Sequence, residues 1–267
     1  MPSPWLTRTT MSNHRIPPEI CDHIIDFLQD NPETLKQCCL VSKSWVSRTR
    51  EHLFAVVMFR TPDDLEVWKK IFPDPSNSPA HHTHTLSVKC LKAITAVDAA
   101  NGGWIPTFSC VASLKTFSPP RDNLGMTNLA PFRKFSPTLK SLSVVLCSFI
   151  PSQAIDLIYY FPLLEDLTLI GNNSVFEEPQ AVSSSATSPP LTGTLELRLA
   201  PGFARMVNRL LDLPNGLHFQ KLTLAPSKEE GLPPVGKLVE VCSETLEHLD
   251  VSHQPQCAIH FFPPSDQ

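Results

Sequence analysis

The chain has 267 residues, of which 42% are hydrophobic, and a formal net charge of −4 at pH 7. This length suits one or two domains, and the apolar content is enough for a sizeable core. The charges are of mixed sign, without the basic patch typical of nucleic-acid-binding proteins. No run approaches the roughly 18 apolar residues of a membrane span. We therefore expect a cytoplasmic or nuclear protein with neither a nucleic-acid nor a membrane partner.

The first residues and the cysteines fit this frame. Residues 1–13 lack the apolar segment of a signal peptide and are predicted to be a disordered leader. No two cysteines have the C-x-x-C spacing of a redox or metal motif, and most stand within apolar patterns. This usage is typical of reduced, buried thiols rather than of a disulfide framework. The eight are Cys21, Cys38, Cys39, Cys90, Cys110, Cys147, Cys242 and Cys257.

Three short helices are predicted between residues 16 and 54. Pro17 and Pro18 suit the first turn of a helix, where no backbone N–H is needed. Asn31 is a good N-cap for a second helix that opens with Pro32, and Ser42 can cap a third. Proline has no backbone N–H to leave unpaired in the first turn, and the Asn and Ser side chains can accept from the N–H groups there. These residues therefore mark the three helix starts.

These helices carry more apolar surface than so small a unit can bury. Ile20, Ile24, Phe27 and Leu28 recur at helical spacing along the first helix. Domains of this size are short of core, so part of this surface is expected to meet a partner. The other apolar positions are Leu35, Cys38 and Cys39 in the second helix and Trp45, Val46, Leu53 and Phe54 in the third.

The order of residues in this stretch resembles an F-box. Its opening reads Ile16-Pro17-Pro18-Glu19-Ile20, where the family pattern has leucine-proline-x-glutamate-isoleucine, and it closes on Val41-Ser42-Lys43-Ser44-Trp45. The resemblance implies a helical domain over residues 14–60 that docks to a Skp-type adaptor and through it to a cullin–RING ubiquitin ligase. It implies adaptor contacts from Ile16, Pro17, Ile20, Val41 and Trp45, with Ile24, Leu28 and Leu35 divided between core and interface.

Residues 61–84 are predicted to be a linker helix and a loop. Thr61, Pro62 and two acids open the helix, and its buried side is expected to carry Leu65, Trp68, Ile71 and Phe72. The loop holds three histidines that could bind a metal ion. No fourth ligand is near them, so a polar surface loop without a metal is the expectation. They are His81, His82 and His84.

From residue 85 to residue 267 short β-like runs with leucines recur. Leu142, Leu167, Leu195, Leu222 and Leu249 stand at steps of 25, 28, 27 and 27 residues. Such steps, within the roughly 20–29 residues of a leucine-rich repeat, predict stacked units. Alternation points Leu167 and Leu169 inward. Two further runs, at 85–91 and 111–117, are expected to be irregular strands of the same array.

Helices are predicted between the strands, over 152–161, from Phe203 to Pro214 and around Leu238 and Cys242. Alternating strands and helices predict an α/β fold with parallel strands. The region resembles the divergent leucine-rich repeats behind many fungal F-boxes, which implies a surface for a protein substrate. Residues 177–193 are expected to form a long loop. After Val251 no capping helix is apparent, which favours a shorter version of a longer protein over a fold-back of Phe261 and Phe262.

No catalytic motif is found. Gly231, Gly236 and Lys237 have P-loop spacing, but Leu238 replaces the hydroxyl residue and Pro233-Pro234 removes two N–H groups. We expect neither an enzyme nor a cofactor. The prediction is a substrate-recognition adaptor of a Skp–cullin–F-box ubiquitin ligase. The alternative is a ligase-independent repeat scaffold, in which the helices only cap the array.

Overall fold

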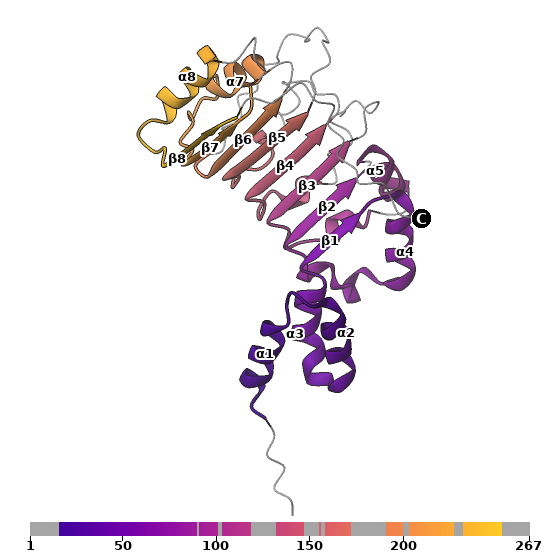
Figure 1. The fold of residues 1–267 in the computed structure, drawn as a ribbon. Helices are drawn as coiled ribbons and strands as arrows, with labels where there is room; N and C mark the ends of the chain where they lie inside the picture. The colour runs from indigo at the N-terminus through magenta and orange to yellow at the C-terminus, as the bar shows by residue number, and fades with distance from the viewer. Residues whose placement is uncertain are drawn as a thin grey trace, which may run out of the picture. The chain divides into compact units, whose positions relative to one another are not determined.

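The structure is a computed structural model that describes residues 16–89, 91–100, 103–118, 132–146, 155, 158–171, 191–199, 203–226 and 232–252. Its contacts divide the chain into two compact units (Figure 1). We call Met1–Phe54 the helical unit and Ala55–Gln267 the sheet unit.

The helical unit contains α1 (Pro18–Phe27), α2 (Pro32–Val41) and α3 (Lys43–Leu53). The predicted helix starts are confirmed. Pro18 occupies the first position of α1, and the Asn31 side chain accepts a hydrogen bond from the Thr34 N–H at 3.1 Å. Ser42 Oγ accepts one from the Ser44 N–H at 3.3 Å. These side chains satisfy amides that the first turn of a helix leaves free.

The sheet unit is built on eight parallel strands whose order in the sheet is their order in the chain. This confirms the predicted α/β class with parallel strands. The strands are β1 (Val56–Phe59), β2 (Thr85–Lys89), β3 (Ser113–Ser118), β4 (Ser141–Leu146), β5 (Asp166–Gly171), β6 (Thr194–Leu199), β7 (Lys221–Leu224) and β8 (His248–Val251). The helices are α4 (Pro62–Ile71), α5 (Leu91–Ala100), α7 (Phe203–Leu211) and α8 (Leu232–Cys242), with 3₁₀ turns at Pro75–Asn77, Pro79–His82 and Ile105–Thr107.

One register runs across the whole sheet. A single row of aligned positions joins Val57, Leu86, Leu114, Leu142, Leu167, Leu195, Leu222 and Leu249. The runs at 85–91 and 111–117 are therefore regular members of the array, not irregular ones. The array also begins earlier than expected. The boundary predicted at residue 60 lies after Phe54 instead, because β1 is hydrogen bonded to β2.

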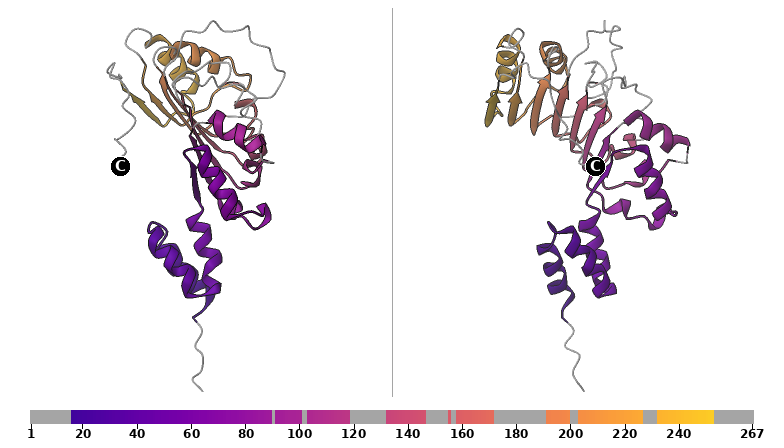
Figure 2. Two further views of the ribbon diagram at one scale, coloured as in Figure 1. Left: turned by 90° about the vertical axis from the view of Figure 1, so that its right-hand side faces the viewer. Right: turned by 45° about the vertical axis from the view of Figure 1, so that its right-hand side comes forward.

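The core of the sheet unit lies under one face of the sheet. Leu167 and Leu169 are buried as predicted, and the alternate residues of β5, Asp166, Thr168 and Ile170, are half-exposed. The same alternation recurs in β1, β6 and β7. Helices α4, α5, α7 and α8 all lie on the buried side (Figure 2). The opposite face, which we call the open face, has no helix over it within the described parts of the chain.

Aromatic side chains fill the core at the β1 end of the sheet. Phe59 packs edge-on against Trp68 of α4 and against Phe108, each at 5.9 Å between ring centroids. The α4 helix that supplies Trp68 begins as predicted, with the Asp64 carboxylate accepting from the Thr61 N–H at 3.1 Å. Ile71, expected on the buried side, is 62% exposed because α4 buries the side that carries Leu65 and Trp68.

Three helices were predicted after residue 150, and the structure describes two of them in full and one in part. Helix α7 lies where it was expected, and α8 runs through Gly236 and Lys237 without interruption, so these two residues lie in a helix and not in a phosphate-binding loop. The helix predicted over 152–161 is helical at Ile155, Ile158 and Tyr159 and ends in a turn at Tyr160. Positions 152–154, 156 and 157 lie outside the described residues. So do most of the 177–193 insertion and the chain after Ser252.

The described cysteines are free thiols, but not all are buried. Cys38 and Cys242 are buried, and burial raises the pKa of the Cys242 thiol, which favours its neutral form. Cys21 and Cys39 are half-buried, and Cys110 is exposed, contrary to expectation. Cys110 lies in a turn that follows the 3₁₀ turn Ile105–Thr107, and no described helix or strand covers its side chain there.

Candidate partner-binding site

The helical unit exposes most of the residues that the F-box resemblance selects. Ile16, Ile20, Ile24 and Val41 are 57%, 49%, 42% and 66% exposed, and Pro17 is exposed as well. Large aliphatic side chains are usually buried, so a group of this kind is the informative feature of the unit. We call these five residues, with Phe27 and Leu40, the apolar patch, a name that groups them by their exposure alone.

Helix α1 has two apolar sides. Its inward side carries Ile25, which is fully buried, with Cys21 and Leu28 half-buried. Its outward side carries Ile20, Ile24 and Phe27 at spacings of four and three, and Phe27 is 93% exposed. Residues at this spacing form one stripe of a helix. Sequence reasoning placed Phe27 on this stripe but did not select it as a contact.

The remaining predicted contacts, Leu28, Leu35 and Trp45, are less exposed. Leu35 is 1% exposed and belongs to the core of the helical unit. Leu28 and Trp45 are half-buried. Leu40, which was not predicted, is 81% exposed at the end of α2, next to Val41. In the sequence, only its position next to Val41 indicated that Leu40 could belong to the contact surface.

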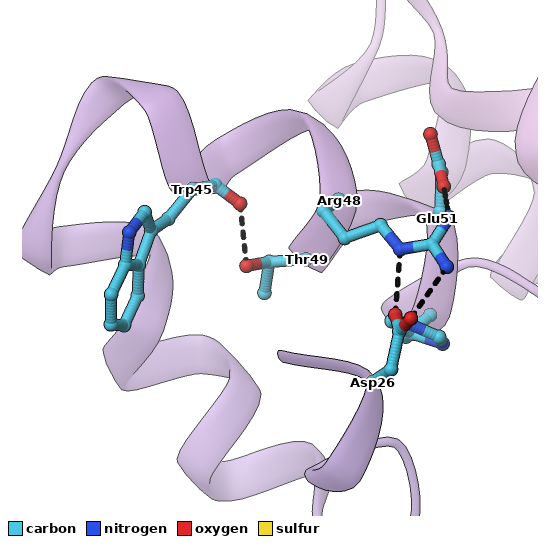
Figure 3. Close-up of polar contacts among 6 residues, drawn as sticks. Asp26, Trp45, Arg48, Thr49 and Glu51 are labelled. Carbon is cyan, nitrogen blue, oxygen red and sulfur yellow. Dashed lines mark hydrogen bonds and ion pairs between the residues drawn. The ribbon is translucent and has the colours of Figure 1, made fainter. Parts of the chain in front are cut away.

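Polar contacts hold α1 against α3 (Figure 3). The Arg48 guanidinium donates from Nε to Asp26 Oδ1 at 2.6 Å and from Nη2 to Asp26 Oδ2 at 2.9 Å. His52 Nε2 lies 2.7 Å from the same Oδ1, and Arg48 Nη1 donates to Glu51 Oε2 at 2.6 Å. Two parallel bonds between a guanidinium and a carboxylate fix both distance and orientation. The network therefore sets the angle at which α1 presents its outward stripe.

The network shifts the pKa values of Asp26 and Arg48. Hydrogen bonding from Arg48, and next from His52, holds the pKa of the Asp26 carboxyl well below its ordinary range. The same pairing, with Glu51, raises the pKa of Arg48. Both side chains are about one-third exposed, at 37% for Arg48 and 34% for Asp26, so solvent screens the pair.

Helix α3 buries the hydroxyl group of Thr49. Thr49 is fully buried, and its Oγ1 donates to the Trp45 carbonyl oxygen at 2.6 Å, one turn earlier (Figure 3). This bond satisfies a polar group that would otherwise be costly to bury. It also ties the turn of α3 that carries Trp45 to the core of the helical unit.

Other titratable residues form no comparable site. Among the described residues, no three histidines, cysteines or carboxylates gather as a metal-ion site would require. His81 and His82 are in contact, with ring centroids 3.9 Å apart and ring planes tilted by 46°, and His84 is exposed in its loop. No helix in the described part of the chain is long and apolar enough to cross a membrane.

Comparison with known proteins adds no relative. No protein-family model matches the chain, and no curated protein and no solved structure is similar to it. The apolar patch and the parallel sheet are therefore the observations on which a function must rest.

Proposed function

We propose that the protein is the substrate-recognition adaptor of a Skp–cullin–F-box ubiquitin ligase. In this proposal the helical unit docks to the Skp-type adaptor through the apolar patch, and the sheet unit, as a leucine-rich-repeat-like solenoid, binds a protein substrate. The protein itself carries out no chemistry. It raises the concentration of substrate near the ligase by holding both.

The observation that supports docking is the exposure of the apolar patch. Ile20, Ile24 and Phe27 form one stripe, while Ile25 on the opposite side of α1 is already buried in the unit's own core. A helix with a full inward side needs no further apolar residues for folding. An outward stripe of three is what a helix uses to bind a hydrophobic groove. A specific complex should bury on the order of 1,000 Å² or more in total.

The Asp26–Arg48 pair supports the same proposal from the polar side. A docking helix binds tightly when it is held rigidly before the partner arrives, because less conformational freedom is then lost. The two bonds of 2.6 and 2.9 Å hold α1 on α3 without using any residue of the outward stripe.

The scaffold alternative makes a different demand of the helical unit. Helices that only cap the array would be expected to bury their large aliphatic residues. The exposures of Val41 at 66% and Ile16 at 57% favour docking over capping.

Co-purification of the full chain with a Skp-type adaptor tests the proposal. Ile20→Asp with Ile24→Asp should abolish capture, because two charges would enter an apolar contact. Ile71→Asp, at an exposed isoleucine of α4 in the sheet unit, is the control and should leave capture unchanged. Failure of the unsubstituted, folded protein to capture the adaptor would reject the proposal.

A further inference from the structure

Within the described part of the chain, strand β8 is the last strand of the sheet, and the residues on its inward face are exposed. It pairs with β7 on one side, and no strand pairs with its other side among the described residues. All four of its residues are exposed. Leu249 and Val251 are 44% and 39% exposed, whereas the aligned Leu222 and Leu224 of β7 are fully buried. An unpaired edge with exposed apolar residues is a template for pairing with another chain.

The backbone of β8 shows which amides are available. The His248 N–H donates to the Gln220 carbonyl at 3.0 Å, and the Ser252 N–H donates to the Leu224 carbonyl at 2.9 Å. Even-numbered residues therefore direct their hydrogen-bonding groups at β7. Because these groups alternate sides along a strand, the N–H and C=O of Leu249 and Val251 point away from β7, toward the free edge.

We propose that two copies of the protein pair through β8, antiparallel, about a two-fold axis at Leu249. In this arrangement the Leu249 N–H of one copy donates to the carbonyl of the partner's Leu249, and the reverse bond is also made. An antiparallel hydrogen-bonded pair requires both groups of both residues to face the partner, as those of Leu249 do. Closed two-fold pairing of this kind is the commonest form of self-association.

Hydrogen-bonding complementarity between an imidazole and a carboxylate selects this register. With Leu249 on the axis, His248 stands opposite the partner's Asp250, and Asp250 opposite the partner's His248. These are non-hydrogen-bonded positions, where Cα atoms approach to roughly 4.5 Å and side chains meet most closely. A two-fold axis at Val251, the other residue with free groups, would place Asp250 opposite the partner's Ser252 and lose both pairs.

The remaining side chains are compatible with pairing. Leu249 would lie against the partner's Leu249 on the inward face, where the inner strands carry leucines. Glu247 is exposed, and its side chain would stand opposite the partner's Val251, so no two acids are brought face to face. Its N–H donates to the Gln220 carbonyl oxygen at 2.8 Å and therefore adds no bond to the partner. The inference concerns the sheet unit alone and does not depend on docking by the helical unit.

Sedimentation of the full chain over a range of concentrations tests the proposal. We expect a monomer–dimer equilibrium in the unsubstituted protein. His248→Asp alone should weaken dimerisation by about 10- to 100-fold, since it places two pairs of carboxylates opposite one another. Asp250→Lys alone should also weaken it, since it removes both carboxylates that the imidazoles of His248 would meet. The double variant H248D/D250K places a carboxylate opposite an ammonium group at both pairs and should restore the dimer to within a few-fold of the original.

A control variant tests whether an added charge weakens dimerisation only when it lies on β8. Thr168→Lys adds the same charge in the same row of aligned positions but on β5, three strands away from the edge, and should leave dimerisation unchanged. A monomer at all concentrations would overturn the proposal. So would single variants that dissociate the dimer without rescue by the double variant, because rescue requires His248 to face the partner's Asp250.

Discussion

Arg48 binds Asp26 through two parallel hydrogen bonds of 2.6 and 2.9 Å, and this pair joins α3 to α1 in the helical unit. Neither residue belongs to the apolar patch. The pair therefore positions the outward stripe of α1 without being part of the surface that would meet a partner. Its consequences can be measured apart from binding.

Acid should loosen α1. The pKa of Asp26 is lower in the folded chain than its ordinary value of about 3.9, mainly because Arg48 donates to the carboxylate. Its stabilising effect is therefore complete above that ordinary value and is lost as the pH falls through the folded pKa. Hydrogen exchange of residues 18–27 should accelerate below about pH 4 relative to the rest of the chain.

The Asp26→Asn variant identifies the source of that acid sensitivity. It should exchange faster at neutral pH and show little further change on acidification. Glu33→Gln is the control, since Glu33 and Lys36 form a surface pair whose side chains are 80% and 59% exposed. Such pairs contribute little, so this variant should behave like the unsubstituted protein. Equal effects from the two substitutions would contradict the role given to Asp26.

The aromatic core at the β1 end should be a large contributor to the stability of the sheet unit. Phe59→Ala removes a ring that is 2% exposed and touches both Trp68 and Phe108. We expect a loss of about 3–5 kcal/mol in the free energy of unfolding by denaturant. Val56→Ala, three residues earlier on the same strand and 62% exposed, should change it by less than about 0.5 kcal/mol.

Two glycines should respond in opposite directions to alanine. A Cβ at Gly193 would lie 2.5 Å from Asp166 Oδ1, which accepts from the Thr194 N–H, and 3.1 Å from the Glu165 carbonyl oxygen. Gly193→Ala should lower the free energy of unfolding by about 1–3 kcal/mol. Gly236, inside α8, has nothing within 4 Å of such a Cβ. Gly236→Ala should raise it by about 0.5–1 kcal/mol. A shared sign in denaturant titrations would contradict this account.

Asp98 should be needed for the turn after α5. Its carboxylate is 1% exposed and accepts from the N–H groups of Trp104 and Ile105 at 2.6 and 3.1 Å. Asp98→Ala leaves these buried amides unpaired, at a cost of about 2 kcal/mol or more. Asp98→Asn retains one acceptor and should lose less, and the order of the two variants in thermal melts checks the assignment.

Much of the architecture follows from local sequence signals. Prolines and capping side chains at Pro18, Asn31, Ser42 and Thr61 fixed the starts of four helices, because they act within one turn. The leucine spacing from Leu142 onward predicted parallel strands in order. The first strands were harder to recognise. In β1 the aligned position is Val57 rather than leucine, so the start of the array became visible only through pairing with Leu86.

The candidate site was predicted in composition but not in orientation. Ile20, Ile24, Ile25 and Phe27 are all apolar, so both sides of α1 suit a core. Which side turns inward depends on a contact distant in sequence, that of Asp26 with Arg48 of α3, which places Ile25 against the core and Phe27 outside. Periodicity along one helix carries no information about such a contact.

The binding constant of the full chain for a Skp-type adaptor tests the central claim most directly. Calorimetric titration should give a specific complex, and Ile20→Asp with Ile24→Asp should weaken it by at least about 100-fold, as loss of central apolar contacts does. Ile71→Asp should leave the constant unchanged. Binding lost in the double variant alone would support the adaptor function. No binding by the folded protein, or equal binding by all variants, would contradict it.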